Sequence, residues 1–505
     1  MHAKMFSRVT TMTLFAALAM PVCIAAQDNP SPDHKTKHQK YKLIDLGTFG
    51  GPNSYVNGPT IPDLSNGGTY AGSADTSVPD PYAPYYCASP DCLVLHAQKW
   101  WNGVGTDLGT LPGTNLSSGA TWVSGNGIIA GASENGLIDP LLGMPEVRAV
   151  VWTKDDQIVN LGALEGGYES FADAVNDRGQ VAGWFTNTIP DPFSMGCYIV
   201  CPYTTQLRGF LWQHGVMRDL GTLGGPDALP LAINERGQII GISYTSSIPN
   251  PDSGIPTIDP FLWQNGAMVD IGTLGGTFGN ANFINSRGQV VGNSNLAGDQ
   301  TNHGYLWDRG SLKDLGTLGG DNVQALWIND AGDVVGVSDL TGSQTHDAFL
   351  WRKGVMTDLG NLGLSSFGFA INSEGQVVGH SKINDGTFRA FMWEKGGPMV
   401  DLNTLFSPGS GIVLVDPYYI NDRGYIAVRG VLANGNERAV VLVPDGDCDD
   451  DCEGRIAASQ NNAAPAQNAA TMKQDSESRV SPANQFRNRI MQRYRMAGQT
   501  AAPSN

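Results

Sequence analysis

Two proline-rich segments carry the side chains with the clearest binding chemistry. Residues 79–82 read Pro-Asp-Pro-Tyr and precede two adjacent tyrosines, and residues 190–193 read Pro-Asp-Pro-Phe and precede two more. Aromatic side chains provide a large contact area at a small cost in conformational entropy, which suits sugar- and protein-binding surfaces. The alternative is that they only cover strand ends in surface loops. The candidate ligand-binding residues are Tyr82, Tyr85, Tyr86, Phe193, Tyr198 and Tyr203.

Six cysteines fall in three close pairs when the first 26 residues are set aside. In an exported chain, an even number of closely spaced cysteines favours disulfides. A zinc site is the weaker alternative, because the pairs lie far apart in sequence and lack clustered histidines. We therefore predict local disulfides and no metal centre. The predicted pairs are Cys87 with Cys92, Cys197 with Cys201, and Cys448 with Cys452.

The densest acidic segment, residues 445–453, reads Asp-Gly-Asp-Cys-Asp-Asp-Asp-Cys-Glu. A calcium loop presents carboxylates at alternate positions, which this segment offers in part, but the full EF-hand spacing is missing. The favoured interpretation is a solvated acidic turn held by a disulfide, with a Ca²⁺ site as the alternative. No other cofactor is expected.

Catalytic chemistry is hard to place, because most polar residues recur with an internal repeat and a single active site would not. Paired carboxylates for glycoside hydrolysis remain open, since Asp139, Asp191 and Asp259 lie in insertions and nothing singles out two of them. His96 and His303 share one strand-start position and are interpreted as polar edge residues. The recurring aspartates, predicted to cap backbone amides, are Asp45, Asp107, Asp219, Asp270, Asp314, Asp358 and Asp401.

Eight sequence repeats must position these residues. The phrase Asp-Leu-Gly-Thr-Leu-Gly-Gly and its degenerate copies start 43 to 62 residues apart. Each copy is followed by a phrase of the type Ala-Ile-Asn-x-x-Gly-Gln-Val-Val-Gly, and then by basic-Ala-Phe-Leu-Trp, which ends at Trp101 in the first copy. Short apolar runs separated by turn residues predict four β-strands per repeat, which is the size of a propeller blade.

The chain begins and ends inside a repeat. Residues 41–47 form the Asp-Leu-Gly strand of one copy, and residues 438–443 form an isolated strand of the Ala-Phe-Leu-Trp type. Sheet edges need partners, and an open solenoid would need capping units. We therefore predict an all-β fold, a closed β-propeller of eight four-stranded blades whose ring closes by pairing the N- and C-terminal strands.

These phrases resemble the HAF family of bacterial extracellular repeats, named for its His-Ala-Phe start, over roughly residues 41–444. The resemblance implies an exported protein and supplies no activity. The histidine is mostly replaced by arginine here, at Arg148, Arg208, Arg389 and Arg438, which argues against a histidine-based function. The Gly-Gly doublet with a later Trp is similar in layout to kelch-type propellers.

The two ends have the composition of targeting and linker segments. Lys4 and Arg8 precede a short apolar run and small residues near Ala26, which is typical of a signal peptide of a secreted, extracellular or periplasmic protein. Use of Cys23 as a lipidated residue is disfavoured, because the preceding residues are not small. The predicted segments are signal peptide 1–26, linker 27–40, propeller 41–444, acidic Cys-containing loop 445–454, disordered linker 455–480 and basic tail 481–505 with a short helix.

Charge and strand direction limit the function. Residues 27–454 carry 22 basic and 46 acidic side chains, so this body repels phosphate backbones and nucleic acid is excluded as a partner. No other apolar stretch is long enough for a transmembrane helix. Strand alternation sends the tight hairpins to one face, and the long insertions at 73–95, 132–147, 184–207 and 242–258 to the other.

We therefore expect a non-enzymatic exported protein whose insertion-rich face binds a glycan, a cell-envelope polymer or a protein. A propeller enzyme acting on polysaccharide through paired carboxylates is one alternative. A structural surface protein without a specific ligand is the other. The oligomeric state is left open.

Overall fold

The computed structural model describes residues 38–83, 89–141, 143, 145–164, 166–195, 205–251, 253–394 and 396–446. The compact unit that begins at Gln39 contains every described strand. The predicted signal peptide, most of the N-terminal linker and the predicted segments from residue 447 onward lie outside the described residues. Apart from a 3-10 turn, η1 (Leu402–Thr404), the described elements are β-strands.

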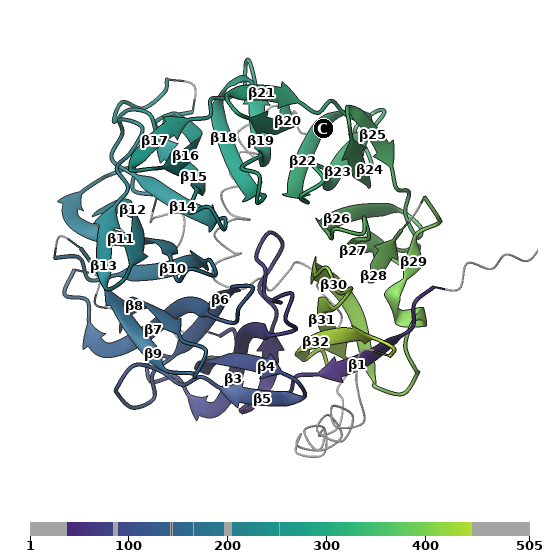
Figure 1. Ribbon diagram of the computed structural model, residues 1–505, viewed down its shortest axis with the longest axis horizontal. Helices are drawn as coiled ribbons and strands as arrows, with labels where there is room; N and C mark the ends of the chain where they lie inside the picture. Colours follow the sequence, from purple (N-terminus) through teal and green to yellow (C-terminus); the bar gives the residue numbers. More distant parts are fainter. Residues whose placement is uncertain are drawn as a thin grey trace, which may run out of the picture. The chain divides into compact units, whose positions relative to one another are not determined.

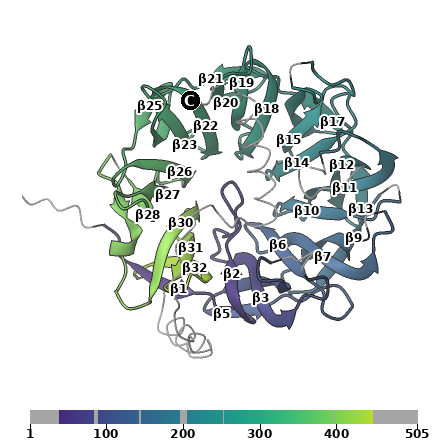
Figure 2. The same cartoon turned by 180° about the vertical axis from the view of Figure 1, so that it is seen from behind.

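The strands fall into units of four. The first strand of each unit lies nearest a common centre (Figures 1 and 2). These strands are β2 (Gly50–Tyr55), β6 (Ser118–Val123), β10 (Ser170–Val175), β14 (Ala228–Ile233), β18 (Gly275–Ile284), β22 (Gly319–Ile328), β26 (Ser365–Ile371) and β30 (Ile412–Ile420). The second strands are β3 (Tyr70–Pro79), β7 (Ile129–Ile138), β11 (Val181–Pro190), β15 (Ile239–Tyr244), β19 (Val290–Leu296), β23 (Val334–Leu340), β27 (Val377–Lys382) and β31 (Ile426–Leu432).

The third and fourth strands complete each unit on the outside. The third strands are β4 (Leu93–Trp101), β8 (Pro145–Trp152), β12 (Thr205–Gln213), β16 (Ile258–Gln264), β20 (Asn302–Asp308), β24 (His346–Arg352), β28 (Phe388–Trp393) and β32 (Glu437–Pro444). The fourth strands are β5 (Val104–Asp107), β9 (Ile158–Gly162), β13 (Val216–Asp219), β17 (Ala267–Asp270), β21 (Ser311–Asp314), β25 (Val355–Asp358), β29 (Val400–Asp401) and β1 (Tyr41–Asp45).

Hydrogen bonding groups the described strands into six sheets of four strands and one sheet of eight. The larger sheet is two four-stranded units joined by one parallel bridge between Ile258 and Phe278. In the last sheet, β1 pairs antiparallel with β32, so that Tyr41 lies opposite Pro444 and Asp45 opposite Val440. The first and last strands of the chain therefore share one sheet, as both views show (Figures 1 and 2).

The repeated phrases form the expected turns. Between the third and fourth strands, Lys353 and Gly354 both have positive φ, of 50° and 93°, which is the conformation of tight hairpin turns. The Gly that ends Gln-Val-Val-Gly serves another purpose. A Cβ on Gly379 would lie 2.0 Å from the carbonyl oxygen of Phe367 on the neighbouring strand. At this point the register of β26 against β27 shifts by a bulge, and only glycine leaves room for it.

The Asn of the Ile-Asn-x-x-Gly phrase opens a turn, as predicted, and also joins each unit to the next. The Oδ1 atom of Asn285 accepts hydrogen bonds from the backbone amides of Arg287 and Gln289, at 3.1 and 3.0 Å. Its Nδ2 donates to the Asn329 carbonyl of the following unit at 3.0 Å. The same inter-unit bond is made by Asn176, Asn234, Asn329, Asn372 and Asn421, the last of which donates to the carbonyl of Ser65.

One sequence assignment in the first repeat is wrong by one residue. Trp100, not Trp101, occupies the position of the repeat tryptophan, because Trp100 pairs with Tyr70 as Trp152 pairs with Ile129. Trp100 is 3% exposed and Trp101 is 53% exposed. Two adjacent tryptophans make the register ambiguous in the sequence, because this degenerate first copy lacks the Phe that marks the phrase in other copies.

Candidate functional site

A pocket of about 320 Å³ lies where the turns between the first and second strands converge. Every unit contributes to its lining, from Leu64 in the first turn to Tyr419 before the last. We call it the axial pocket, and the face on which it opens the turn face. The segment between β2 and β3 reaches the centre (Figure 1) and supplies Pro62 and Leu64 to the wall.

Aromatic rings form one side of the axial pocket. Trp122 stacks on Phe283 with ring centroids 6.4 Å apart, and Phe283 stacks on Trp327 at 3.6 Å. Tyr419 meets Trp327 edge-on at 5.2 Å. Trp122 and Phe283 come from units that are not neighbours in the chain, so the rings meet across the centre. Four aromatic residues therefore give the pocket an apolar lining suited to a flat ligand.

The polar rim of the axial pocket follows directly from the turn phrase. The residue after each turn Asn lines the pocket, and four of these residues are carboxylates. The backbone amide and hydroxyl of Ser286 donate to Asp330 at 2.9 and 2.7 Å. Burial and the neighbouring Asp177 raise the pKa of Glu235. The described lining contains no lysine or arginine, and its carboxylates are Asp177, Glu235, Asp330 and Asp422.

Asp63, beside the pocket wall, is fully buried. One carboxylate oxygen accepts the backbone amide of Asn57 at 2.8 Å, and the other has no hydrogen-bond partner. Burial raises the pKa of Asp63 to about 8. The hydrogen bond from the Asn57 amide to the Asp63 carboxyl fixes the segment that carries Pro62.

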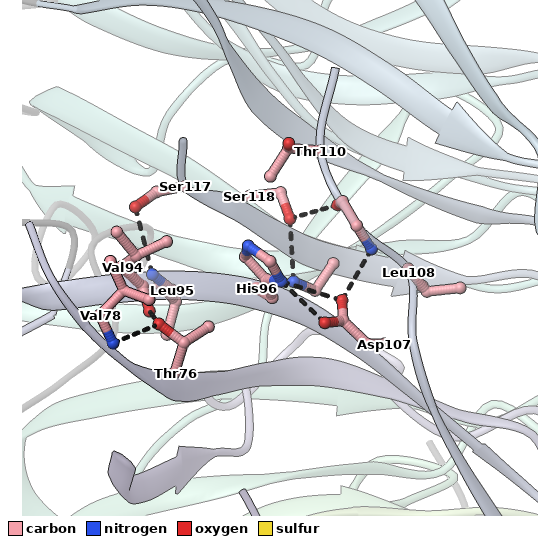
Figure 3. Close-up of polar contacts among 12 residues, drawn as sticks. Thr76, Val78, Val94, Leu95, His96, Asp107, Leu108, Thr110, Ser117 and Ser118 are labelled. Carbon is pink, nitrogen blue, oxygen red and sulfur yellow. Dashed lines mark hydrogen bonds and ion pairs between the residues drawn. The ribbon is translucent and has the colours of Figure 1, made fainter. Parts of the chain in front are cut away.

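The recurring aspartates cap backbone amides, as predicted. In Figure 3, Asp107 accepts the amide of Gly109 at 2.8 Å, and the Nδ1 atom of His96 lies 2.8 Å from the same carboxylate. Ser118 completes this cluster by donating to the Gly109 carbonyl at 2.7 Å. The same cap is made by Asp45, Asp219, Asp270, Asp314, Asp358 and Asp401. His96 therefore has the edge role that the sequence indicates.

In four units the basic residue at the start of the third strand pairs with this aspartate. Arg208 contacts Asp219, and His303 contacts Asp314 at 2.8 Å. In two units the basic position is acidic: Asp347 lies near Asp358 and, as the more strongly perturbed exception, Asp259 faces Asp270. Burial and the Asp270 charge raise the pKa of Asp259 to about 7. The exception therefore carries an unfavourable carboxylate pair.

In three further places an acidic residue of an insertion lies near a buried carboxyl group of the next unit. Burial, with a smaller contribution from the neighbouring Asp139, raises the pKa of Glu169 to about 9. Asp191 lies against Asp227, whose oxygens accept the amides of Met195 and Leu207 at 2.5 and 2.9 Å. Burial and Asp191 raise the pKa of Asp227 to about 8. The third pair is Asp80 with Glu134. Burial, with a smaller contribution from Asp80, raises the pKa of Glu134 to about 7.

These pairs bear on the enzyme alternative. The sequence marks Asp139 and Asp191 but not their partners, because each partner lies in the next repeat. Glu169 and Asp227 are 1% and 0% exposed. Neither side chain lines the axial pocket or the other described cavity. The described hydrogen bonds of Glu169 and Asp227 are to backbone amides, which is a structural role.

One charged cluster does not recur. The Nδ1 atom of His380 lies 2.6 Å from Asp416, and Arg429 binds the other oxygen of that carboxylate at 2.7 Å. Burial alone would raise the pKa of Asp416, but Arg429 and His380 together hold it well below its usual range. Phe369 and Phe388 enclose the imidazole at 4.9 and 4.6 Å. The cluster joins two units and borders neither of the two cavities described here.

The predicted aromatic residues are only partly described. Tyr82 is half-buried, and its amide donates to Asp80. Phe193 packs against the Trp184 cluster, and its carbonyl accepts the Tyr244 hydroxyl at 2.8 Å. The structure does not bring Tyr82 and Phe193 together, and neither lines a described pocket. Tyr85, Tyr86, Tyr198 and Tyr203 lie outside the described residues.

The cysteines and the acidic loop lie mostly outside the described residues as well. Cys92 is disulfide-bonded. Its predicted partner, and the other two predicted pairs, fall in the parts that are not described, so the pairing stays a prediction. Of the acidic segment, only Asp445 and Gly446 are described. The described residues contain no group of three or more His, Cys, Asp or Glu side chains arranged to hold a metal ion.

The pocket aromatics could have been found from the sequence. They occupy the position two residues before the turn Asn or its Ser equivalent, where the other repeats mostly have alanine. An aromatic residue in place of the usual alanine indicates a position that does not share the packing of the other copies. The four exceptions are Trp122, Phe283, Trp327 and Tyr419.

No family model and no curated protein matches this chain. Among solved structures, it is similar to a Mycobacterium tuberculosis puromycin-hydrolyzing peptidase, at 12% identity and a TM-score of 0.41 over 79% of this chain. The match spans 61% of the peptidase. TolB from Acinetobacter baumannii matches at 14% identity and a TM-score of 0.30, over 59% of this chain and 76% of TolB. Likenesses this weak carry no argument about function. Among the described residues, no helix is long and apolar enough to cross a membrane.

Proposed function

We propose that this chain is an exported, non-enzymatic binding protein of the HAF type, built as a closed propeller of eight blades. Its ligand site is the axial pocket. The observation that carries the proposal is the group of four aromatic rings set inside a wall to which every unit contributes.

Two contacts support closure. The pairing of β1 with β32 joins the first and last described strands within one sheet. The Asn ladder continues from the last unit to the first, because Asn421 donates to the Ser65 carbonyl at 2.8 Å. A ring closed in this way leaves no unit without neighbours, which removes the exposed sheet faces of an open stack.

The lining defines the ligand chemistry. Aromatic faces stack on the apolar face of a sugar ring, and they attract cations. Rim carboxylates accept hydrogen bonds from hydroxyls and bind ammonium groups. A volume of about 320 Å³ lies at the small end of ligand pockets, so one ring enters rather than a chain. The pocket is therefore suited to the terminal amino sugar of a glycan or cell-envelope polymer.

A fluorescence titration tests this proposal, because Trp122 and Trp327 line the pocket. Glucosamine oligomers should change the tryptophan emission of the full chain and saturate. Asp330→Asn with Asp422→Asn should weaken binding at least tenfold, whereas Asp155→Asn, at an exposed carboxylate in the turn after β8, should not. Equal binding by the rim variant and the wild type would refute the pocket as the site.

A further inference from the structure

A second cavity, of about 800 Å³, lies on the turn face between the β10–β13 unit and the β14–β17 unit. Two of its arginines come from turns between first and second strands, and the third comes from β13. Trp263 and two glutamines from third strands complete the side walls. We call it the arginine groove, defined by Arg178, Arg218, Arg236, Gln213, Gln264 and Trp263.

The groove is basic on an acidic protein. The chain has a net charge of −17, yet three guanidinium groups line this cavity with a single carboxylate, Asp219. That carboxylate is already bound by Arg208, at 3.1 Å from both of its oxygens. The groove therefore keeps an excess of positive charge.

The arginine side chains are available to a ligand. All three are exposed. Within the described part of the chain, the guanidinium groups of Arg178 and Arg218 make no hydrogen bond or ion pair. Arg236 donates one bond, to the carbonyl of Arg287 at 3.1 Å. Arg178 lowers the pKa of Glu235, but that carboxylate accepts the Asp177 amide and lines the axial pocket.

The junction between the β18–β21 unit and the β22–β25 unit has the same layout and shows what is unusual about the arginine groove. Lys313 occupies the position of Arg218, and it lies 4.8 Å over the ring of Trp351, the counterpart of Trp263. In the same unit, Arg352 is bound at 2.9 and 2.7 Å by Asp333.

The arginine groove has no counterpart of the ion pair between Arg352 and Asp333. Gln264 stands where Arg352 stands, and Gln238 stands where Asp333 stands. These two glutamines bond to each other at 2.9 Å. Neutral amides therefore replace an internal ion pair at this junction.

We propose that the arginine groove binds an acidic saccharide, through carboxylate or sulfate groups on a hydroxyl-rich chain. Guanidinium groups bind both oxyanions in a fork geometry. Glutamine amides suit sugar hydroxyls, and the Trp263 ring suits the apolar face of a sugar. A cavity of about 800 Å³ has room for more than one ring. This site shares no lining residue with the axial pocket and is separate from it.

Calorimetric titration of the full chain with trigalacturonate tests the proposal, and a sulfated disaccharide distinguishes carboxylate from sulfate recognition. One of these ligands should bind, and added salt should weaken the binding. Arg178→Gln with Arg218→Gln should reduce the affinity at least tenfold without changing the melting temperature, because these side chains have no described partners. The matched control is Arg309→Gln, at an arginine whose side chain is 91% exposed in the turn between β20 and β21, and it should bind as the wild type does.

Three outcomes would overturn the proposal. They are the absence of binding heat with both ligands, an equal loss of affinity in the Arg309 variant, and equal affinity for a polyglutamate peptide, which would show a site without saccharide specificity. The axial-pocket variant Asp330→Asn should keep its trigalacturonate affinity. A failure of the axial proposal would therefore not be mistaken for a failure of this one.

Discussion

The unit in which two aspartates face each other offers a sharp test of the repeat's electrostatics. The start of the third strand is basic in six repeats, but Asp259 occupies it in the β14–β17 unit. One oxygen of Asp259 is buried without a hydrogen-bond partner, and the Asp270 carboxylate interacts with the Asp259 side chain. Asp259→Asn should therefore stabilise the protein at neutral and alkaline pH.

The magnitude follows from the raised pKa. The folded pKa of Asp259 is about 7, against 3.8 for the free group. Three units correspond to about 4 kcal/mol, and solvent screening at this partly open site reduces the figure to about 2 kcal/mol. The folded state binds the proton more tightly, so stability falls as pH rises from about 4 to about 7. Above that range the full cost applies.

Thermal unfolding between pH 4 and pH 9 measures the effect. An entropy of unfolding of about 2 cal/mol/K per residue over roughly 400 residues converts about 2 kcal/mol into a rise of about 2 °C at pH 8. At pH 4 the variant and the wild type should melt together. Asp219→Asn is the opposite control, because it removes the partner of Arg208 and should lower the melting temperature at pH 8. A difference between wild type and Asp259→Asn that did not change with pH would refute the reasoning.

Three further substitutions test the packing. Asp416→Asn removes one of the two carboxylates that bind the half-buried Arg429, leaving Glu437 at 3.0 Å, and should cost about 3 kcal/mol, measured by urea unfolding. Because the pKa of Asp416 is lowered, its contribution is present above about pH 4 and is lost only in stronger acid, so a constant penalty down to pH 1 would contradict the assignment. Asn372→Ala removes an inter-unit bond and a turn cap and should cost about 2–3 kcal/mol, whereas an unchanged melting temperature would deny the ladder a structural role. Trp100→Ala should cost about 3–5 kcal/mol and Trp101→Ala less than about 1, and the reverse order would restore the original assignment of the repeat.

The repeat phrases predicted the strands and turns well, because each phrase encodes its own local structure. Asn285 shows how far this goes: its turn could be predicted, but its bond to Asn329 could not. That bond depends on how tightly successive units pack, which no single phrase specifies. Glu169 was missed for the same reason, since its partner Asp139 lies in the preceding repeat.

The candidate site was harder to predict than the fold. The tyrosines of the insertions stand out in the sequence, whereas Phe283 and Trp327 lie inside ordinary strand phrases. Periodicity shows that such residues face one side of a strand, but not that strands from distant units bring them together. Only the convergence of the first strands places these rings within 3.6 Å of each other.

The most direct test of the account is a crystal structure of the full chain with a glucosamine oligomer. The account predicts density for one terminal ring against Trp327, with its amino group close to Asp330 or Asp422. Density on the insertion face beside Tyr82, with an empty axial pocket, would contradict it.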